Sequence, residues 1–124
     1  MKRVLIVDDH DLFRQVLAVV LRQHTDLKES VQAESLAEAR RVLANLGGKI
    51  DLAIVDLDMS DRTGTELIKE LRDAEPNVPV LAFTVGRSIQ LRARALQAGA
   101  DQVLSTATPG EKIVRAAELL VGGG

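Results

Sequence analysis

Three aspartates and one threonine stand directly after short apolar runs of this sequence. Asp8 and Asp9 follow residues 4–7, Asp56 follows residues 52–55, and Thr84 follows residues 79–83. Such runs are typical of strands buried on both faces of a parallel sheet. Because parallel strands end at a common edge, where functional groups of such sheets gather, the sequence predicts three carboxylates and a hydroxyl at one edge.

Three neighbouring carboxylates repel one another unless a cation lies among them. Mg²⁺ is the expected cofactor, because it prefers oxygen ligands and keeps part of its water shell. The metal would also neutralise an incoming phosphoryl group, while Asp56 attacks phosphorus to give an acyl phosphate. The hydroxyl of Thr84 would then hydrogen-bond a phosphoryl oxygen.

Aspartates at strand ends also have a simpler interpretation as helix caps. Asp9 or Asp11 taken alone is explained by capping of the helix that follows. Capping does not explain Asp56, which precedes a long loop, so the whole set favours a functional site. His10 and His24 are isolated from any ligand set in the sequence, and we interpret them as a loop residue and a helix-end residue.

The rest of the sequence alternates between strand and helix signals. Apolar residues recur at helical spacing after the first acidic loop, at Leu12, Val16, Val19 and Val20. Strands are expected at 4–7, 29–33, 52–55, 79–83 and 102–105, and helices at 12–24, 36–46, 64–74, 88–98 and from 108 onward. This alternation predicts an α/β domain with a parallel sheet and helices on both faces.

Two helix starts carry specific signals. Ser35 and Glu38 have the spacing of a capping box. Thr108 and Pro109 offer an N-cap followed by a proline at the first helical position. Both signals support helices at those places.

Length and composition indicate one ordinary globular domain. The chain has 124 residues, 46% of them hydrophobic, and a formal net charge of -2, so no global positive field draws it to nucleic acid. It has no cysteine, and its first apolar run is too short for a signal peptide or a membrane span. We expect a cytoplasmic protein with no membrane partner, whose domain covers 1–121 and whose glycines 122–124 form a tail or linker stub.

Several segments resemble the receiver domain of two-component response regulators, over essentially the whole chain. VLIVDDHDLFR resembles the opening strand and acidic pair, AIVDLDMSDRTG the phosphoacceptor segment, and VPVLAFT and LQAGAD the later strand and helix end. The resemblance implies a flavodoxin-like, doubly wound (βα)5 fold with sheet order 2-1-3-4-5. It also implies phosphorylation of Asp56 by a histidine kinase or a small phosphodonor. Mg²⁺ would be held by Asp8 or Asp9, Asp56 and the backbone carbonyl of Asp58.

The opening VDDH is most similar to regulators that carry a helix-turn-helix output domain. DNA is therefore expected as a partner only through an output domain outside these residues. The family also implies an interaction face built from its fourth helix, fifth strand and fifth helix, and a homodimer is one expected use of it.

The sequence departs from the family pattern at three positions. Thr106 stands where the active-site lysine is expected, and the chain has no lysine between Lys69 and Lys112. Val85 stands where a small residue guards access to the aspartate, and Val103 where a switch aromatic is usual. Arg62 and Arg87 are the cations that could replace the lysine from neighbouring loops.

Two alternative functions stay open on the sequence alone. The departures favour a pseudo-receiver, a protein-interaction module with weak or no phosphorylation. Asp56-Leu57-Asp58 is a D-x-D after an apolar strand, which also fits a haloacid-dehalogenase-like phosphatase in which Asp58 is a general acid. The short length and the absence of a cap domain disfavour this enzyme.

Overall fold

Five strands alternate with five helices in the described part of the chain, which comprises residues 2–60, 64–86 and 88–122 of a computed structural model. The strands are β1 (Lys2–Val7), β2 (Leu27–Ala33), β3 (Leu52–Asp56), β4 (Val80–Thr84) and β5 (Gln102–Ser105). The helices are α1 (Asp11–His24), α2 (Leu36–Leu46), α3 (Gly64–Ala74), α4 (Ile89–Ala98) and α5 (Gly110–Val121).

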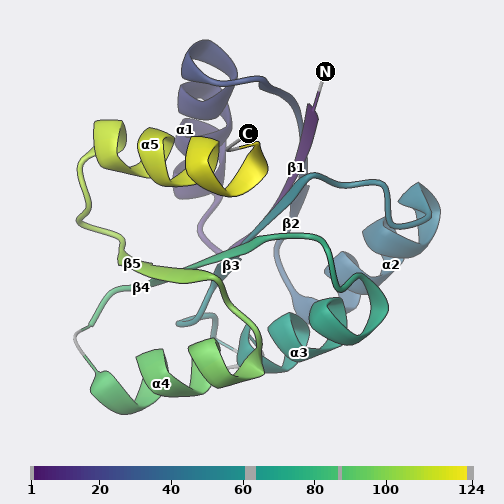
Figure 1. Ribbon diagram of the computed structural model, residues 1–124, viewed down its shortest axis with the longest axis vertical. Coiled ribbons are helices and arrows are strands. Elements are labelled where there is room, and N and C mark those ends of the chain that lie inside the picture. The colour runs from purple at the N-terminus through teal and green to yellow at the C-terminus, as the bar shows by residue number, and fades with distance from the viewer. Residues whose placement is uncertain (1, 61–63, 87, 123–124) are drawn as a thin grey trace.

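The strands form one parallel sheet in the order β2-β1-β3-β4-β5. Helices α1 and α5 lie together on one face, and α2, α3 and α4 lie on the other (Figure 1). The predicted doubly wound α/β fold and its strand order are confirmed.

Local signals explain most element boundaries. Ser35 is the N-cap of α2, and its hydroxyl accepts a hydrogen bond from the backbone N–H of Glu38 at 3.1 Å, as the capping box predicts. Gly47 ends the same helix with a φ of 61°, a left-handed conformation that favours glycine. The prediction for α5 was wrong by one residue. Pro109, with a ψ of 144°, is extended and forms the N-cap, so the helix begins at Gly110.

Helix α1 is present as predicted, but its apolar spacing does not mark its buried face. Leu12, Val16 and Val19 are exposed, whereas Leu17, Leu21 and the charged Arg14 are buried. Arg14 can be buried because other groups of the chain bind its guanidinium, as described below.

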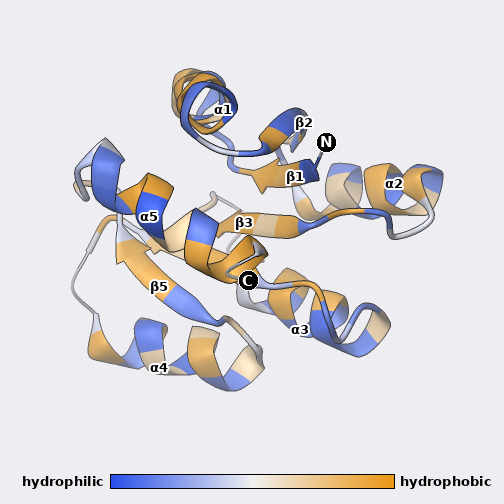
Figure 2. Cartoon of the chain, turned by 45° about the horizontal axis from the view of Figure 1, so that its top comes forward, coloured by the Kyte–Doolittle hydropathy of each residue, from blue (hydrophilic) through white to orange (hydrophobic). Residues whose placement is uncertain are grey.

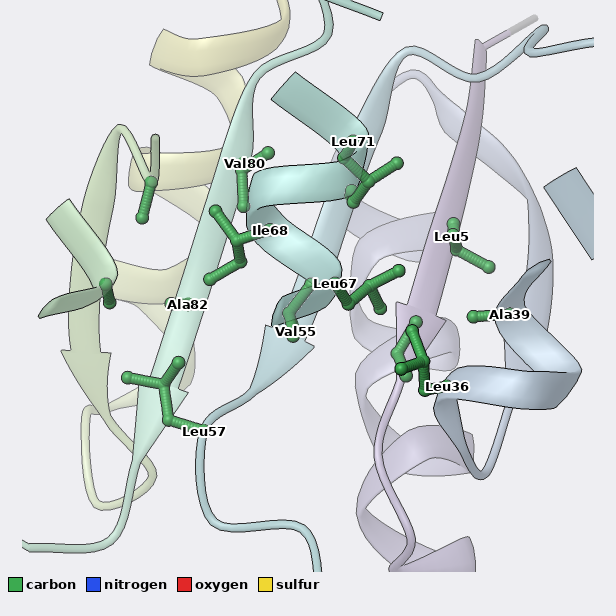
Figure 3. Packing of buried hydrophobic residues seen from close by; sticks show 14 of the residues in the cluster. Leu5, Leu36, Ala39, Val55, Leu57, Leu67, Ile68, Leu71, Val80 and Ala82 are labelled. Atoms are coloured by element: carbon green, nitrogen blue, oxygen red, sulfur yellow. The ribbon is translucent and has the colours of Figure 1, made fainter. Parts of the chain in front are cut away.

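Two hydrophobic cores lie on opposite faces of the sheet. The core under α2, α3 and α4 contains leucine, isoleucine and valine side chains such as Leu5, Val55, Leu67 and Ile68 (Figure 3). The core under α1 and α5 contains Phe83, whose ring meets Phe13 edge to face at 5.6 Å. Hydrophobic residues predominate along β3 and the later part of β1, while β5 and the helices contain both hydrophobic and hydrophilic residues (Figure 2). The central strands are thereby fixed on both faces, which fixes the positions of the loops that follow them.

Across the described residues, every helix is too short or too polar to cross a membrane.

Candidate functional site

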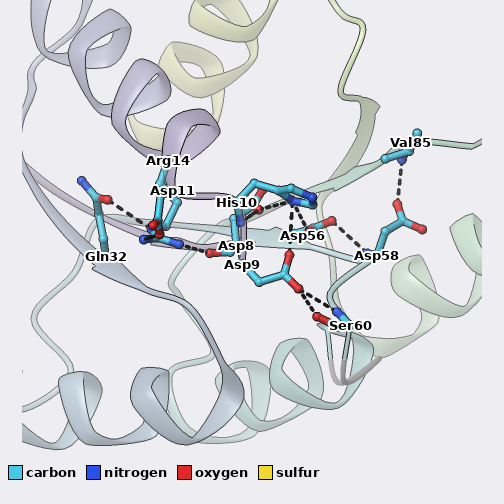
Figure 4. A network of polar contacts seen from close by, with 10 residues as sticks. All are labelled: Asp8, Asp9, His10, Asp11, Arg14, Gln32, Asp56, Asp58, Ser60 and Val85. Carbon is cyan, nitrogen blue, oxygen red and sulfur yellow. Dashed lines mark hydrogen bonds and ion pairs between the residues drawn. The ribbon is translucent and has the colours of Figure 1, made fainter.

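Four side chains from two strand ends meet at the carboxyl edge of the sheet (Figure 4). Asp8, Asp9 and His10 come from the loop after β1, and Asp56 is the last residue of β3. One potential ligand atom from each lies within 4.8 Å of all the others. The predicted convergence of the three carboxylates is therefore confirmed.

The sheet register explains why these residues meet. Val7 of β1 pairs with Val55 of β3, so the next residues, Asp8 and Asp56, lie side by side at the ends of these strands. The backbone N–H of Asp8 donates to the carbonyl of Ala33 at 3.0 Å, which holds the end of β1 to β2. Both aspartates are almost fully buried, at 3% exposure each.

Gly64, at the start of α3, lies directly against the backbone at the end of β3. A Cβ at Gly64 would lie 2.5 Å from the carbonyl oxygen of Asp56 and 3.1 Å from the Cα of Leu57. Any larger residue would have to displace this backbone. The glycine eight residues after Asp56 is therefore a packing requirement of the site.

Arg14 holds the acidic loop from behind. Its guanidinium donates to the carbonyl of Asp8 and to the carboxylate of Asp11, and its Nε donates to Gln32 at 3.2 Å. A buried guanidinium requires such partners. Arg14 was not predicted as part of the site, because its partners are apparent only once α1 and β2 are in place.

Ser60 hydrogen-bonds to one carboxylate oxygen of Asp9. Its Oδ2 accepts hydrogen bonds from the backbone N–H of Ser60 at 2.8 Å and from the Ser60 hydroxyl. These bonds hold the pKa of Asp9 below its ordinary value. Its other oxygen, Oδ1, is buried and lacks a hydrogen-bond donor within the described residues.

Asp56 has a raised pKa of about 6. Burial is the largest cause, since it penalises the charged carboxylate, and the neighbouring charges of Asp8 and Asp58 act in the same direction. A hydrogen bond from the backbone N–H of Asp58 to Asp56 Oδ1, at 2.8 Å, partly opposes them. Near neutral pH the carboxylate is mostly ionised but poorly solvated.

His10 is the site residue that the sequence interpretation missed. Its Nδ1 lies 3.0 Å from Asp8 Oδ1, 3.2 Å from Asp9 Oδ1 and 4.0 Å from Asp56 Oδ2, so the prediction that it is isolated was wrong. A hydrogen bond and the charge of Asp8 raise the pKa of His10. The motif Asp-Asp-His was the available signal. His24 is the last residue of α1, as predicted.

Helix capping does not account for the acidic loop. The N-cap of α1 is His10, whose side chain makes no capping hydrogen bond, and Asp11 is already the first residue of the helix. The simpler interpretation of Asp9 or Asp11 as a cap was therefore wrong.

Thr84 is the last residue of β4, and Thr106 directly follows the neighbouring strand β5. Thr84 is buried at 1% exposure, and its Oγ1 has no hydrogen-bond partner among the described residues. Thr106 is partly buried, and its backbone N–H donates to the carbonyl of Thr84 at 3.1 Å. No hydrogen bond or ion pair in the described residues joins Thr106 to the three carboxylates.

The other two positions of interest contain aliphatic side chains in different environments. Val85 is 67% exposed, and its backbone N–H donates to the Asp58 carboxylate at 2.6 Å. Val103 is buried in the core under α4, and its carbonyl accepts a hydrogen bond from Arg92 at 2.7 Å. The replacement cations Arg62 and Arg87 lie outside the described residues.

The arrangement suits a hard divalent cation beside the buried carboxylate of Asp56. It supplies three carboxylates. One oxygen of Asp9, Oδ1, is buried and makes no hydrogen bond within the described residues. Oxygen donors of this kind match Mg²⁺ or Ca²⁺. The Thr84 hydroxyl is a second buried polar group that makes no hydrogen bond in the described part of the chain.

A five-stranded doubly wound sheet with an acidic pocket at its carboxyl edge defines a class of phosphoacceptor signalling domains. The family model described as "Response regulator receiver domain" matches residues 4–118, and the chain belongs to this family. It is a receiver domain of two-component signalling, a phosphoacceptor module and not a catalytic enzyme. The family match overturns the phosphatase alternative.

Named relatives support the same assignment. The chain is 33% identical to the methanol utilization control regulatory protein MoxX of Paracoccus denitrificans over 98% of this chain and 54% of the relative. It spans about half the length of the curated relatives it matches.

Solved structures give the same fold. A response regulator from Burkholderia pseudomallei, solved with a phosphorylated aspartic acid, a calcium ion and citrate, is 29% identical with a TM-score of 0.83, over 94% of this chain and 66% of that one. The beryllofluoride-activated NtrC4 receiver dimer is 24% identical with a TM-score of 0.87, over 99% of this chain and 98% of that one.

Proposed function

We propose that this receiver accepts a phosphoryl group on Asp56 with Mg²⁺ in the acidic pocket, and that its conformational response to phosphorylation is weak. The observation that carries the proposal is the convergence of Asp8, Asp9 and Asp56. Each offers a carboxylate oxygen that lies within 4.8 Å of the others. The phosphorylated aspartic acid and the calcium ion of the Burkholderia pseudomallei regulator support it.

Asp56 acts as the nucleophile in this proposal. One carboxylate oxygen forms a bond to phosphorus, and the bond from phosphorus to the leaving oxygen breaks, so acetyl phosphate yields an aspartyl phosphate and acetate. Burial leaves the ionised carboxylate poorly solvated, which favours attack, and a pKa of about 6 keeps it ionised near neutral pH.

Asp8, Asp9, Asp56 and the backbone carbonyl of Asp58 are the proposed Mg²⁺ ligands. The bound cation supplies neutralisation of the phosphoryl charge. Ser60 and Arg14 hold the carboxylate of Asp9 and the backbone of Asp8 in place. Thr84, whose hydroxyl makes no hydrogen bond among the described residues, is the proposed hydrogen-bond donor to a phosphoryl oxygen.

Thr106 occupies the proposed lysine position, which makes this an atypical receiver. A threonine cannot provide the charge-assisted contact of a lysine, which is worth on the order of 1.5–3 kcal/mol. Population shift requires that the phosphoryl group bind one conformation better than the other, so this loss weakens the response. Val103 further excludes an aromatic rotamer switch, and the exposed Val85 is expected to slow access to Asp56.

The second function is a pseudo-receiver that binds a partner independently of phosphorylation. Thr106 and the buried Val103 are the observations that favour it. It differs from the first function in one measurable respect, because its partner affinity does not depend on Asp56.

We also propose binding partners and domain boundaries for this chain. The phosphodonor is a histidine kinase or a small acyl phosphate in the cytoplasm, and receivers of this family interact with such kinases. A homodimer is supported by the dimeric NtrC4 receiver, and contact with DNA would come only through an output domain outside these residues. The receiver domain is taken as 1–121, followed by the glycine tail or linker stub 122–124.

Mass spectrometry after treatment with acetyl phosphate and Mg²⁺ tests the proposal. The wild-type chain should gain one phosphoryl group that Asp56→Asn does not gain. Asp73→Asn, at an exposed position of α3, is the matched control, since it also removes one carboxylate but keeps the nucleophile. Equal labelling of Asp56→Asn would contradict the proposal, and no labelling of the wild type would favour the pseudo-receiver.

A further inference from the structure

His10 places an imidazole nitrogen directly over the acidic pocket. Its Nδ1 faces one oxygen each of Asp8, Asp9 and Asp56, at 3.0, 3.2 and 4.0 Å (Figure 4). The side chain is 67% exposed, so the ring lies at the mouth of the pocket and not in the core. No other histidine is available to the site, because the chain has two and His24 lies at the far end of α1.

These separations match those between ligands of one metal ion. With metal–ligand bonds of about 2.1 Å, neighbouring octahedral ligands are separated by about 3.0 Å and opposite ones by about 4.2 Å. The three distances from Nδ1 to the oxygens of Asp8, Asp9 and Asp56 all fall within this range. Oδ1 of Asp9, which makes no hydrogen bond among the described residues, is one of the three oxygens that Nδ1 faces.

We propose that His10 is a protein ligand of the cation in this pocket and that its imidazole broadens the cation preference toward Co²⁺, Ni²⁺ and Zn²⁺. The inference rests on the metal-binding part of the proposed function, but not on phosphorylation. A pocket of oxygen donors alone favours Mg²⁺ and Ca²⁺, whereas an imidazole nitrogen favours the later first-row cations. His10 is thus a specificity-determining residue for the metal.

Isothermal titration of the whole chain with Co²⁺ and with Mg²⁺, at mildly alkaline pH where imidazole is neutral, tests this role. In His10→Gln, the affinity for Co²⁺ should fall by about tenfold or more, while that for Mg²⁺ should change by less than about threefold. His24→Gln is the matched control and should bind both cations like the wild type.

A spectroscopic measurement identifies the ligand directly. In the Co²⁺-loaded wild type, the proton NMR spectrum should contain paramagnetically shifted imidazole resonances that persist in His24→Gln and disappear in His10→Gln. If they persist in His10→Gln, or if its Co²⁺ and Mg²⁺ affinities fall equally, the role of His10 is overturned while the acidic site stands. If the wild type binds neither cation, the metal part of the proposed function fails as well.

Discussion

The two halves of the pocket edge differ in how completely they are built. At the ends of β1 and β3, the acidic side has buried carboxylates and close hydrogen bonds from Ser60, Asp58 and Arg14. At the ends of β4 and β5 lies the proposed sensing side. Within the described residues, the Thr84 hydroxyl makes no hydrogen bond there, and Thr106 is not bonded to the carboxylates.

This difference separates two steps of signalling that are usually considered together. Acceptance of a phosphoryl group needs a nucleophile and a cation, which the acidic side can provide. Transmission needs groups that bind the new charge in one conformation and not in the other. We therefore expect this receiver to accept a phosphoryl group and to change its conformation only weakly in response.

The largest expected effect concerns the buried charge on the acidic side. Because the pKa of Asp56 is raised to about 6, the folded state binds the proton more tightly than the unfolded chain, and stability falls as pH rises through about 6. Without divalent cations, Asp56→Asn should therefore be more stable than the wild type at pH 8, by up to about 3 kcal/mol. The difference should vanish below about pH 4.

Urea unfolding of both chains across this pH range, with a chelator present, measures the effect. Asp73→Asn, at an exposed position of α3, is the control for a neutralised carboxylate. A stability difference between Asp56→Asn and the wild type that is the same at pH 4 and pH 8 would argue against a raised pKa at Asp56.

The next effect concerns the sensing side. Thr106→Lys should restore a charge-assisted contact and tighten binding of beryllofluoride by roughly tenfold to a hundredfold in the presence of Mg²⁺. Fluorine NMR of the bound ligand gives the affinity, with Thr108→Lys as the control for an added positive charge. Equal tightening in both variants would mean that charge alone, and not position 106, is responsible.

The smallest effect tests how rigidly the acidic side is held. Gly64→Ala should destabilise the fold by about 1–3 kcal/mol, because a Cβ would meet the Asp56 carbonyl oxygen at 2.5 Å. Gly110→Ala is a matched control, since Gly110 also begins a helix but a Cβ there meets nothing within 4 Å. Thermal unfolding compares the two, and equal stability would show that the backbone at Asp56 yields easily.

The fold and the acidic set were predictable because their signals are local. Apolar runs that end in aspartate mark the strand ends, and parallel pairing brings those ends to one edge. Ser35 and Glu38 specify the start of α2 by their spacing alone. The position of Thr84 relative to Asp56 follows from strand order in the same way.

The parts that were not predicted depend on contacts made only in three dimensions. The apolar spacing of Leu12, Val16 and Val19 marks the exposed face of α1, because Arg14 is buried by its bonds to Asp8 and Asp11. The direction of the His10 ring depends on the turn after β1, which no spacing rule describes. Pro109 precedes α5 because its backbone is extended, which the sequence does not specify.

Backbone amide NMR of the wild type with beryllofluoride and Mg²⁺ tests the central claim most directly. We expect large shift changes at residues 8–10 and 56–60, with only small changes in α4 and at 103–106. In Thr106→Lys, the changes should extend into α4 and β5. Equally large changes in α4 and β5 of the wild type would contradict the expectation that these elements respond only weakly to the bound phosphoryl analogue.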